Sequence, residues 1–406
     1  SEYCIAAVGT IVKRESPNLE IPTGMIELKG EYIRIFSESE TPPIYIKENL
    51  DAAENIRLKY RYLDLRRPDM QKMRHKTAKV IRDFLDEQGF LEIETPILGK
   101  STPEGARDYL VPSRNYKGKY YALPQSPQLF KQLLMVSGYD RYFQIAKCFR
   151  DEDLRANRQP EFTQVDMEIS FVDQEEVMDL NERLIQRVFK QILDVDVKLP
   201  IERMTYKAAV DKYGSDKPDL RFGMEINNIS EVVKGVDFKV FQNALENGGS
   251  VRAIKVSGSA ALGRKQLDKL VEFVKTYGAS GLIWMAYKKE GIKCSISKFL
   301  TEENTRNILN KMEAEEGDLI LIVADKNKVV FESLGALRVH MAKQTGILEG
   351  NNDFKFVWIT EFPLLSYNEE EDRYQAEHHP FVMPMDEDIK YLESNPEKVR
   401  AKDKDT

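Results

Sequence analysis

Charged and amide side chains gather where two strand-like segments of this 406-residue chain face each other. The first segment ends in Arg150, Asp151 and Glu152, and the loop that follows closes near Gln159. A guanidinium at a strand end can bind a phosphate through two hydrogen bonds, and a carboxylate beside it can hold an amine or, through Mg²⁺, other phosphates. Ion pairs on an exposed sheet face need the same residue types. These residues alone leave both interpretations open.

The strands on either side of this loop predict which side chains share a face with Arg150. Residues 141–150 and 162–171 each alternate apolar and polar side chains, so we expect them to pair. In the second strand the apolar face carries Val165, Met167, Ile169 and Phe171, and the polar face carries Gln164, Asp166 and Glu168. On that polar face, Asp166 could take an ammonium group.

A helix start supplies the next candidates. Ser126 and Pro127 are a capping hydroxyl followed by proline at the first helical position. Gln128 and Lys131 follow, three residues apart, and share one face of the first turns. A helix N-terminus favours an anion, so this amide and ammonium suit a ligand that carries a carboxylate. An ordinary capped helix with surface residues would look the same.

Two shorter motifs carry weaker signals. Glu104 stands beside a glycine in the loop of residues 102–108, which suits a segment that closes over a cationic group but is also typical of a surface turn. His378 and His379 are adjacent, so on a strand they point to opposite sides and are poor joint ligands for one metal, although one could line a pocket. With three scattered cysteines as well, the sequence predicts no metal site.

Composition limits the class of protein. The chain has 67 acidic and 60 basic residues, a net charge of −7, which argues against a nucleic-acid binder that uses its whole surface. Residues 57–76 are a local exception, with eight Lys or Arg against two Asp and two tyrosines between them. They suit either a phosphate backbone or a solvated linker. With no apolar run of membrane length, the sequence predicts a cytoplasmic protein that does not bind membranes.

Several strings resemble one known family. Residues 149–152 and 161–166 are similar to motif 2 of the class II aminoacyl-tRNA synthetases, and the helix and strand that end at Pro96 are similar to motif 1. The strings at residues 60–67, 103–110, 125–132 and 158–164 narrow the resemblance to the aspartyl-tRNA synthetases of the bacterial type. The resemblance extends over nearly the whole chain.

The resemblance implies an α+β fold with an antiparallel catalytic sheet and helices. The expected domains are a partial OB-fold for anticodon binding at 1–50, a hinge at 51–72, the catalytic domain with motifs 1 and 2 at 73–212, an inserted α/β domain of the GAD type at 213–345, and the rest of the catalytic domain at 346–406. Strand patterns at residues 3–14 and 25–36 predict a hairpin within the first domain. The Gly-Leu-Asp-Arg helix of motif 3 is not found before Thr406, which favours a fragment or a degenerate paralogue.

The resemblance also implies a reaction: L-aspartate is activated with ATP and Mg²⁺ and is transferred to tRNA-Asp by a homodimer. Whether tRNA-Asn is also a partner stays open. Carried over by motif, the aspartate site comprises Glu104, Gln128, Lys131, Arg150, Asp166 and one of His378 and His379. The implied ATP site comprises Arg150, Asp151, Glu152, Gln159 and Gln164, with Arg150 as the catalytic charge at the α-phosphate.

Two alternatives compete with this function, one from another class of protein and one from within the synthetases. One is a non-catalytic RNA-binding relative, which the complete set of motif 2 residues argues against. The other is an asparaginyl- or lysyl-type enzyme, which the inserted domain and the string at residues 125–131 argue against.

We expect Lys131→Met to raise the KM for aspartate far more than the KM for ATP, because the lysine is assigned to a substrate carboxylate and not to a phosphate. ATP–pyrophosphate exchange at varied concentrations of each substrate measures both constants. Equal increases in both would contradict the assignment.

Overall fold

The computed structural model describes residues 2–47, 52–102, 104–153, 158–368, 371–377 and 382–402. Contacts between residues divide the chain into two compact units. The first comprises Ser1–Thr102 and Arg107–Val197, and the second comprises Pro103–Ala106 and Lys198–Thr406. The domain boundaries expected from the sequence are finer than this division, and they stay predictions.

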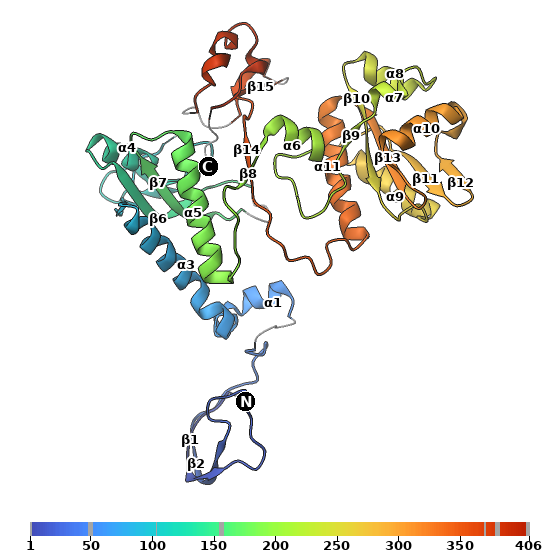
Figure 1. The fold of residues 1–406 in the computed structure, drawn as a ribbon. Coiled ribbons are helices and arrows are strands. Elements are labelled where there is room, and N and C mark those ends of the chain that lie inside the picture. Colours follow the sequence, from blue (N-terminus) through green and yellow to red (C-terminus); the bar gives the residue numbers. More distant parts are fainter. Residues whose placement is uncertain are drawn as a thin grey trace. The chain divides into compact units, whose positions relative to one another are not determined.

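The first unit opens with a hairpin of β1 (Cys4–Lys13) and β2 (Ile26–Ser37), drawn in blue in Figure 1. The predicted hairpin is therefore confirmed, within a residue at each end. Every residue of β2 is exposed. The hairpin has no buried face that would show the rest of a barrel, so the OB-fold stays a prediction.

The centre of the first unit is a three-stranded sheet in the order β3-β6-β7. Its strands are β3 (Leu91–Glu92), β6 (Arg141–Phe149) and β7 (Glu161–Ile169). Helices α3 (Pro68–Glu87) and α5 (Gln174–Leu193) pack on each other beside it. Their shared core consists of Phe84, Leu85, Phe90, Phe143, Leu180 and Leu184, with Met167 and Ile169 packed against it. The apolar face expected for the second strand is therefore confirmed at Met167 and Ile169.

Two details at the ends of these elements differ from the sequence-based expectation. Phe171 was expected on the apolar face, but β7 ends at Ile169 and Phe171 is 95% exposed, with a φ of 61° that takes the chain out of the strand. Helix α4 (Gln128–Val136) has Pro127 as its N-cap and no side-chain cap. It therefore begins one residue later than the Ser126 cap predicts.

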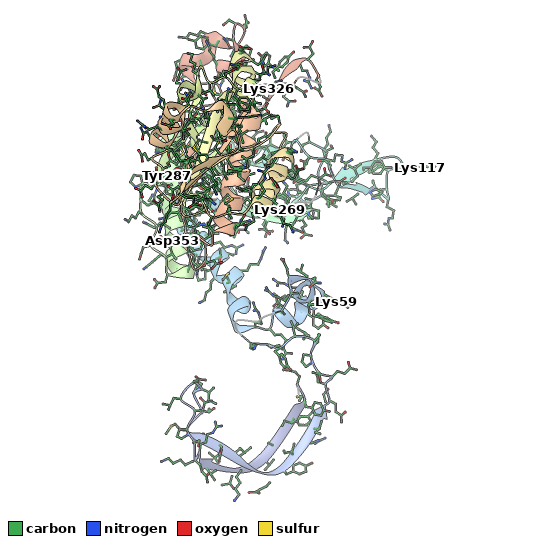
Figure 2. All side chains as sticks on the ribbon, turned by 90° about the vertical axis from the view of Figure 1, so that its right-hand side faces the viewer. Lys59, Lys117, Lys269, Tyr287, Lys326 and Asp353 are labelled. Atoms are coloured by element: carbon green, nitrogen blue, oxygen red, sulfur yellow. The ribbon has the colours of Figure 1, made fainter. Side chains whose placement is uncertain are left out.

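Between α3 and α4 the chain forms a second hairpin, β4 (Leu110–Pro112) and β5 (Tyr120–Ala122). Its turn carries Lys117, which Figure 2 labels at the tip. The backbone of Gly99 pairs with that of Ala122, so the hairpin is fastened at the end of β5 nearest to α4.

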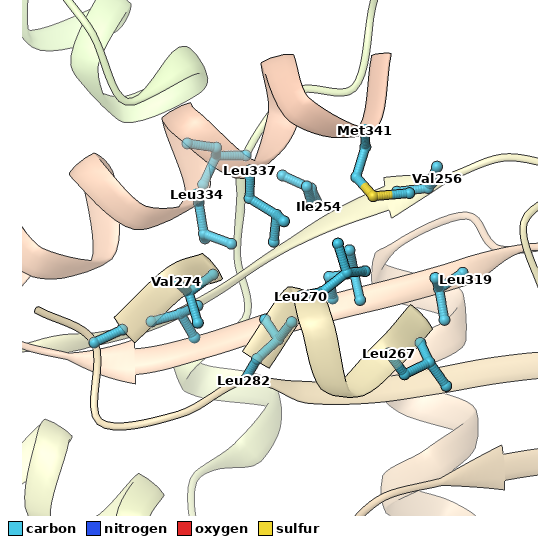
Figure 3. Packing of buried hydrophobic residues seen from close by; sticks show 14 of the residues in the cluster. Ile254, Val256, Leu267, Leu270, Val274, Leu282, Leu319, Leu334, Leu337 and Met341 are labelled. Carbon is cyan, nitrogen blue, oxygen red and sulfur yellow. The ribbon is translucent and has the colours of Figure 1, made fainter. Parts of the chain in front are cut away.

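The second unit contains a five-stranded sheet in the order β12-β11-β13-β10-β9. The strands are β9 (Asn227–Asn228), β10 (Ser250–Val256), β11 (Ile283–Lys288), β12 (Gly291–Cys294) and β13 (Leu319–Asp325). One face packs on α9 (Arg264–Lys275) and α11 (Asn327–Gln344), whose leucines interlock with the strands in Figure 3. The other face packs on α7 (Ser230–Val233), α8 (Lys239–Glu246) and α10 (Glu302–Lys311).

Burial on both faces accounts for the composition of β13. Leu319, Leu321 and Val323 belong to one core, and Ile320, Ile322 and Ala324 belong to the other. A central strand with helices on both sides has no solvent face, so it reads as a continuous apolar run rather than an alternation.

The remaining elements of the second unit flank this layered part. They are β8 (Glu202–Thr205), α6 (Tyr206–Tyr213), β14 (Val357–Thr360), β15 (Leu365–Asn368), β16 (Arg373–Ala376) and the 3₁₀ helices Ser297–Phe299, Asp386–Tyr391 and Pro396–Lys398. Strand β14 pairs in parallel with β8.

In the first unit, α1 (Glu54–Lys59) and α2 (Arg61–Asp64) surround a buried carboxylate. Asp64 is 0% exposed and receives hydrogen bonds from Arg57 at 3.1 and 3.3 Å and from Arg61, while Arg67 lies 3.2 Å away. The hydrogen bond from Arg57 lowers the pKa of Asp64, and the charges of the arginines act in the same direction against the effect of burial. Part of the basic segment at residues 57–76 is therefore ordered by one acid.

We expect Asp64→Asn to lower the urea midpoint of unfolding at neutral pH, because three guanidiniums lose their shared negative charge. A carboxylate with a lowered native pKa stabilises the fold above its unfolded pKa, near 3.8, and this stabilisation is lost as the pH falls through the native pKa. The parent and the variant should therefore converge only below about pH 4. Asp83→Asn, which removes an exposed carboxylate paired with Lys79, is the control and should change the midpoint little. Equal midpoints for Asp64→Asn and the parent at neutral pH would contradict the role of the cluster.

Candidate active site

The register of β6 and β7 brings the predicted polar residues onto one face. Gln144 lies opposite Asp166, Ala146 opposite Gln164, and Cys148 opposite Phe162. The thiol of Cys148 lies 3.2 Å from Oε1 of Gln164, which shows that these two side chains meet. The alternation in the sequence therefore predicted the pairing and the polar face correctly.

Lys131 reaches this face from α4. Its Nζ lies 2.9 Å from Oδ1 of Asp166 and 3.4 Å from Oε2 of Glu168, and its side chain is only 13% exposed. Burial by itself would lower the pKa of Lys131, but the charge of Asp166, its hydrogen bond and the charge of Glu168 outweigh burial and raise the pKa. Lys131 is therefore a fixed, charged ammonium group between two carboxylates.

Asp166 has capacity left for a ligand. It is 7% exposed, and within the described part of the chain its buried Oδ2 has no hydrogen-bond partner. A buried oxygen without a donor is costly unless a ligand or water supplies one. The polar face therefore presents a fixed cation beside an acceptor that a ligand ammonium could use.

Arg150 follows directly after β6. Its guanidinium lies over the ring of Phe162 with 5.0 Å between the guanidinium carbon and the ring centroid, and its backbone N–H donates to the carbonyl of Pro160. Its Nε is buried and has no hydrogen-bond partner among the residues that the structure describes. A guanidinium with a donor left unpaired is a group that a planar or tetrahedral anion could use.

The acids beside Arg150 are held by other arginines. Asp151 lies 3.7 Å from Nε of Arg107, and Glu152 accepts a hydrogen bond of 2.9 Å from Arg158. Gln159 is exposed. Across the described ranges of the chain, no group of three or more His, Cys, Asp or Glu side chains is arranged to hold a metal ion by itself. Carboxylates are nevertheless the groups with which proteins usually hold Mg²⁺, one or two of them together with the phosphates of a substrate.

Comparison with known proteins decides the family. The model of the tRNA synthetases of class II (D, K and N) matches residues 53–406. The chain belongs to the class II tRNA synthetases. An aspartate–tRNA ligase of Clostridium kluyveri is 96% identical over 405 residues, which are 99% of this chain and 69% of that protein.

Further relatives agree with this assignment. An aspartate–tRNA ligase of Clostridium acetobutylicum is 75% identical over 99% of this chain and 68% of its own length, and one of Clostridium novyi is 74% identical over the same shares. An asparaginyl-tRNA synthetase structure from Pyrococcus horikoshii shares 16% identity at a TM-score of 0.43, over 82% of this chain and 80% of that one. The family model and the aspartate–tRNA ligases confirm the resemblance to the aspartyl family and the α+β class.

Four residues predicted for the site of this synthetase are not brought together with the polar face in the described part of the chain. Gln128 is the first residue of α4 and half-buried, and no described residue makes a hydrogen bond or ion pair with its side chain. Glu104 groups with the second compact unit, so its part in the site stays a prediction. His378 and His379 lie outside the described residues.

Two residues of the polar face, Glu168 and Tyr142, were not predicted as site residues from the sequence. Glu168 was placed on the polar face without a role, although its spacing of two from Asp166 already implied that both could reach one cation. Tyr142 lies opposite Glu168 on the same face and is fully buried; its hydroxyl donates to Oε1 of Gln144 at 3.0 Å, which also accepts from Thr95 at 2.9 Å. Burial, followed by the charge of Asp166, raises the pKa of Tyr142, so its hydroxyl stays protonated.

No helix among the described residues is both long and apolar enough to cross a membrane.

Arg150→Ala should lower aspartate-dependent ATP–pyrophosphate exchange about a hundredfold or more, the usual cost of removing one donor that stabilises developing charge. Arg150→Lys, which keeps the charge but loses the planar fork, should fall between the parent and the alanine variant. Arg141→Ala at the opposite end of β6 is the control and should retain most of the exchange. Near-normal exchange by Arg150→Ala would remove Arg150 from the active site.

Proposed function

We propose that this synthetase activates L-aspartate with ATP and transfers it to tRNA-Asp. The pairing of Lys131 with Asp166 on the face that carries Arg150 is the observation that supports it best. These groups match an amino acid with a second carboxylate, and the relatives that are 72–96% identical over 99% of the chain are named aspartate–tRNA ligases.

The aspartate pocket assigns a partner to each charge of the substrate. The free oxygen of Asp166, with Glu104, takes the ammonium group, and Lys131, with Gln128, takes the side-chain carboxylate. One of His378 and His379 closes over the substrate. Asparagine fits this pocket poorly, because the ammonium group of Lys131, placed for a carboxylate, is poorly matched against an amide.

The ATP pocket is centred on Arg150, whose unpaired Nε is directed at the α-phosphate and whose fork also reaches the α-carboxylate of aspartate. Asp151 and Glu152 would hold Mg²⁺, and the bound ion would supply charge neutralisation for the leaving group. Gln159 contacts ATP, and Gln164 lies beside the adenylate.

The reaction requires positioning more than covalent help from the protein. An oxygen of the aspartate α-carboxylate attacks the α-phosphorus in line, the bond to the β-phosphate oxygen breaks, and pyrophosphate leaves. A ribose hydroxyl at the 3′ end of the tRNA then attacks the carbonyl carbon, loses its proton, and releases AMP. Arg150 stabilises the charge that develops in the first step, while Lys131 and Asp166 fix the amino acid at the required distance.

The remaining assignments follow from the family. We place the enzyme in the cytoplasm as a homodimer. The alternatives are an asparaginyl- or lysyl-type enzyme and a non-catalytic RNA-binding relative.

Exchange of pyrophosphate into ATP with aspartate, asparagine or lysine as the only amino acid separates these possibilities. We expect exchange with aspartate to exceed exchange with asparagine about a hundredfold or more, because the ammonium group of Lys131 matches a side-chain carboxylate better than a side-chain amide. Equal exchange with asparagine would favour the asparaginyl alternative, and no exchange with any of the three would favour the non-catalytic one. Charging of tRNA-Asp and tRNA-Asn transcripts then shows which RNA is used.

A further inference from the structure

The hairpin of β4 and β5 carries a cluster of cations that the aspartate and ATP pockets do not use. Arg114, Lys117 and Lys119 occupy its turn, and all three are exposed. Among the residues that the structure describes, none of the three has a hydrogen-bond or ion-pair partner for its side chain. Figure 2 shows Lys117 at the far end of this hairpin.

This cluster, which we name the hairpin tip (residues 113–119), differs from the other exposed cations of the chain. Lys79 pairs with Asp83, Lys190 with Asp194, and Lys275 with Glu272, each within one helix or at its end. By contrast, no Asp or Glu occurs anywhere between residues 109 and 139. The hairpin tip is therefore a patch of uncompensated positive charge on an acidic protein with a net charge of −7.

Exposed aromatic rings accompany these cations. Tyr116 is 64% exposed, Tyr120 59% and Tyr121 40%. Lysine and arginine side chains that alternate with exposed rings are the composition with which proteins bind phosphates and stack on unpaired bases. A protein partner would instead favour a larger apolar surface than a turn between two three-residue strands provides.

The hairpin tip is also joined directly to the proposed aspartate pocket. Strand β5 runs through Gln125, which donates a hydrogen bond to Asp108, into α4 with Lys131. The N–H of Phe149 at the end of β6 donates to the carbonyl of Pro124 in the same segment. An RNA held at the tip would thus be held by the segment that positions Lys131.

We infer that the hairpin tip is an RNA-binding element: Arg114, Lys117 and Lys119 bind the phosphate backbone of the tRNA substrate, and Tyr116 stacks on a base. This inference rests on the proposed function for the identity of the RNA.

The test combines Arg114→Gln, Lys117→Gln and Lys119→Gln in the whole protein and measures binding of a labelled tRNA-Asp transcript over a range of salt concentrations. Affinity at about 0.1 M salt should fall about tenfold or more, and the slope of log affinity against log salt should become shallower by about 2 to 3. The triple variant Arg114→Lys, Lys117→Arg and Lys119→Arg, which keeps all three positive charges, should retain most of the parent's affinity. Tyr116→Leu should weaken binding about fivefold or more, and Tyr116→Phe should not.

A matched control removes the same charge elsewhere. Lys79→Gln, Lys190→Gln and Lys275→Gln together eliminate three exposed lysines that already have carboxylate partners, and they should leave the salt slope nearly unchanged. Equal losses in both triple variants would mean that only net charge matters and would overturn the proposal. Unchanged tRNA affinity in the hairpin variant, or a changed oligomeric state in place of a changed affinity, would overturn it as well.

Aspartate-dependent ATP–pyrophosphate exchange on the same samples separates this proposal from the proposed function. The hairpin variant should exchange like the parent, because no residue of the hairpin tip belongs to the aspartate or ATP pocket. If the parent protein bound tRNA-Asp through the hairpin tip but showed no ATP–pyrophosphate exchange with aspartate, the proposed function would be wrong and the RNA-binding role of the tip would still hold.

Discussion

The antiparallel register of β6 and β7 is the constraint on which the rest of the site depends. Side chains of a strand alternate between faces, so a slip of one residue would move Asp166 into the core beneath α3 and α5 and turn Met167 outward. Burying an unpaired carboxylate and exposing an apolar side chain are both costly. The apolar face therefore fixes the register, and the register places Gln164, Asp166 and the end of β6 at Arg150 on one surface.

The charged side chains on that surface determine which ligand charges can bind there. Lys131 faces two carboxylates, Asp166 and Glu168, so the three groups carry one net negative charge before any substrate is present. The net negative charge would repel a ligand that carried only a carboxylate. A ligand that carried only an ammonium group would not contact Lys131, which would stay paired with Asp166 and Glu168. A zwitterion with an additional carboxylate matches the set, provided that Arg150 offsets the charge near the phosphates. Buried pairs contribute little to stability, and here they fix positions.

The polar face of β6 and β7 could be predicted from the sequence, because the alternation of polar and apolar residues along a strand is a local property. Features that depend on three-dimensional packing could be predicted less well. The Ser126 cap and the place of Phe171 were wrong by one or two residues, because helix and strand ends depend on backbone geometry that periodicity does not encode. The contact of Arg150 with the ring of Phe162, twelve residues away, and its unpaired Nε are products of the fold and could not be read from either residue. The hairpin tip was readable, since the absence of acids between residues 109 and 139 needs only the sequence.

The connection between the hairpin tip and the pocket has a mechanical consequence. The segment from β5 to α4 is held at its middle by the hydrogen bonds of Gln125 with Asp108 and of Phe149 with Pro124, and at β5 by the pairing of Gly99 with Ala122. Moving the tip relative to Lys131 would require several of these bonds to break together, whereas loading the tip with RNA requires none to break. A hairpin of this construction acts as a spacer of fixed length more readily than as a hinge. In the proposed complex, the RNA end would approach the adenylate at a distance set by the backbone of residues 110–131, which is the requirement of a transfer step that depends on positioning.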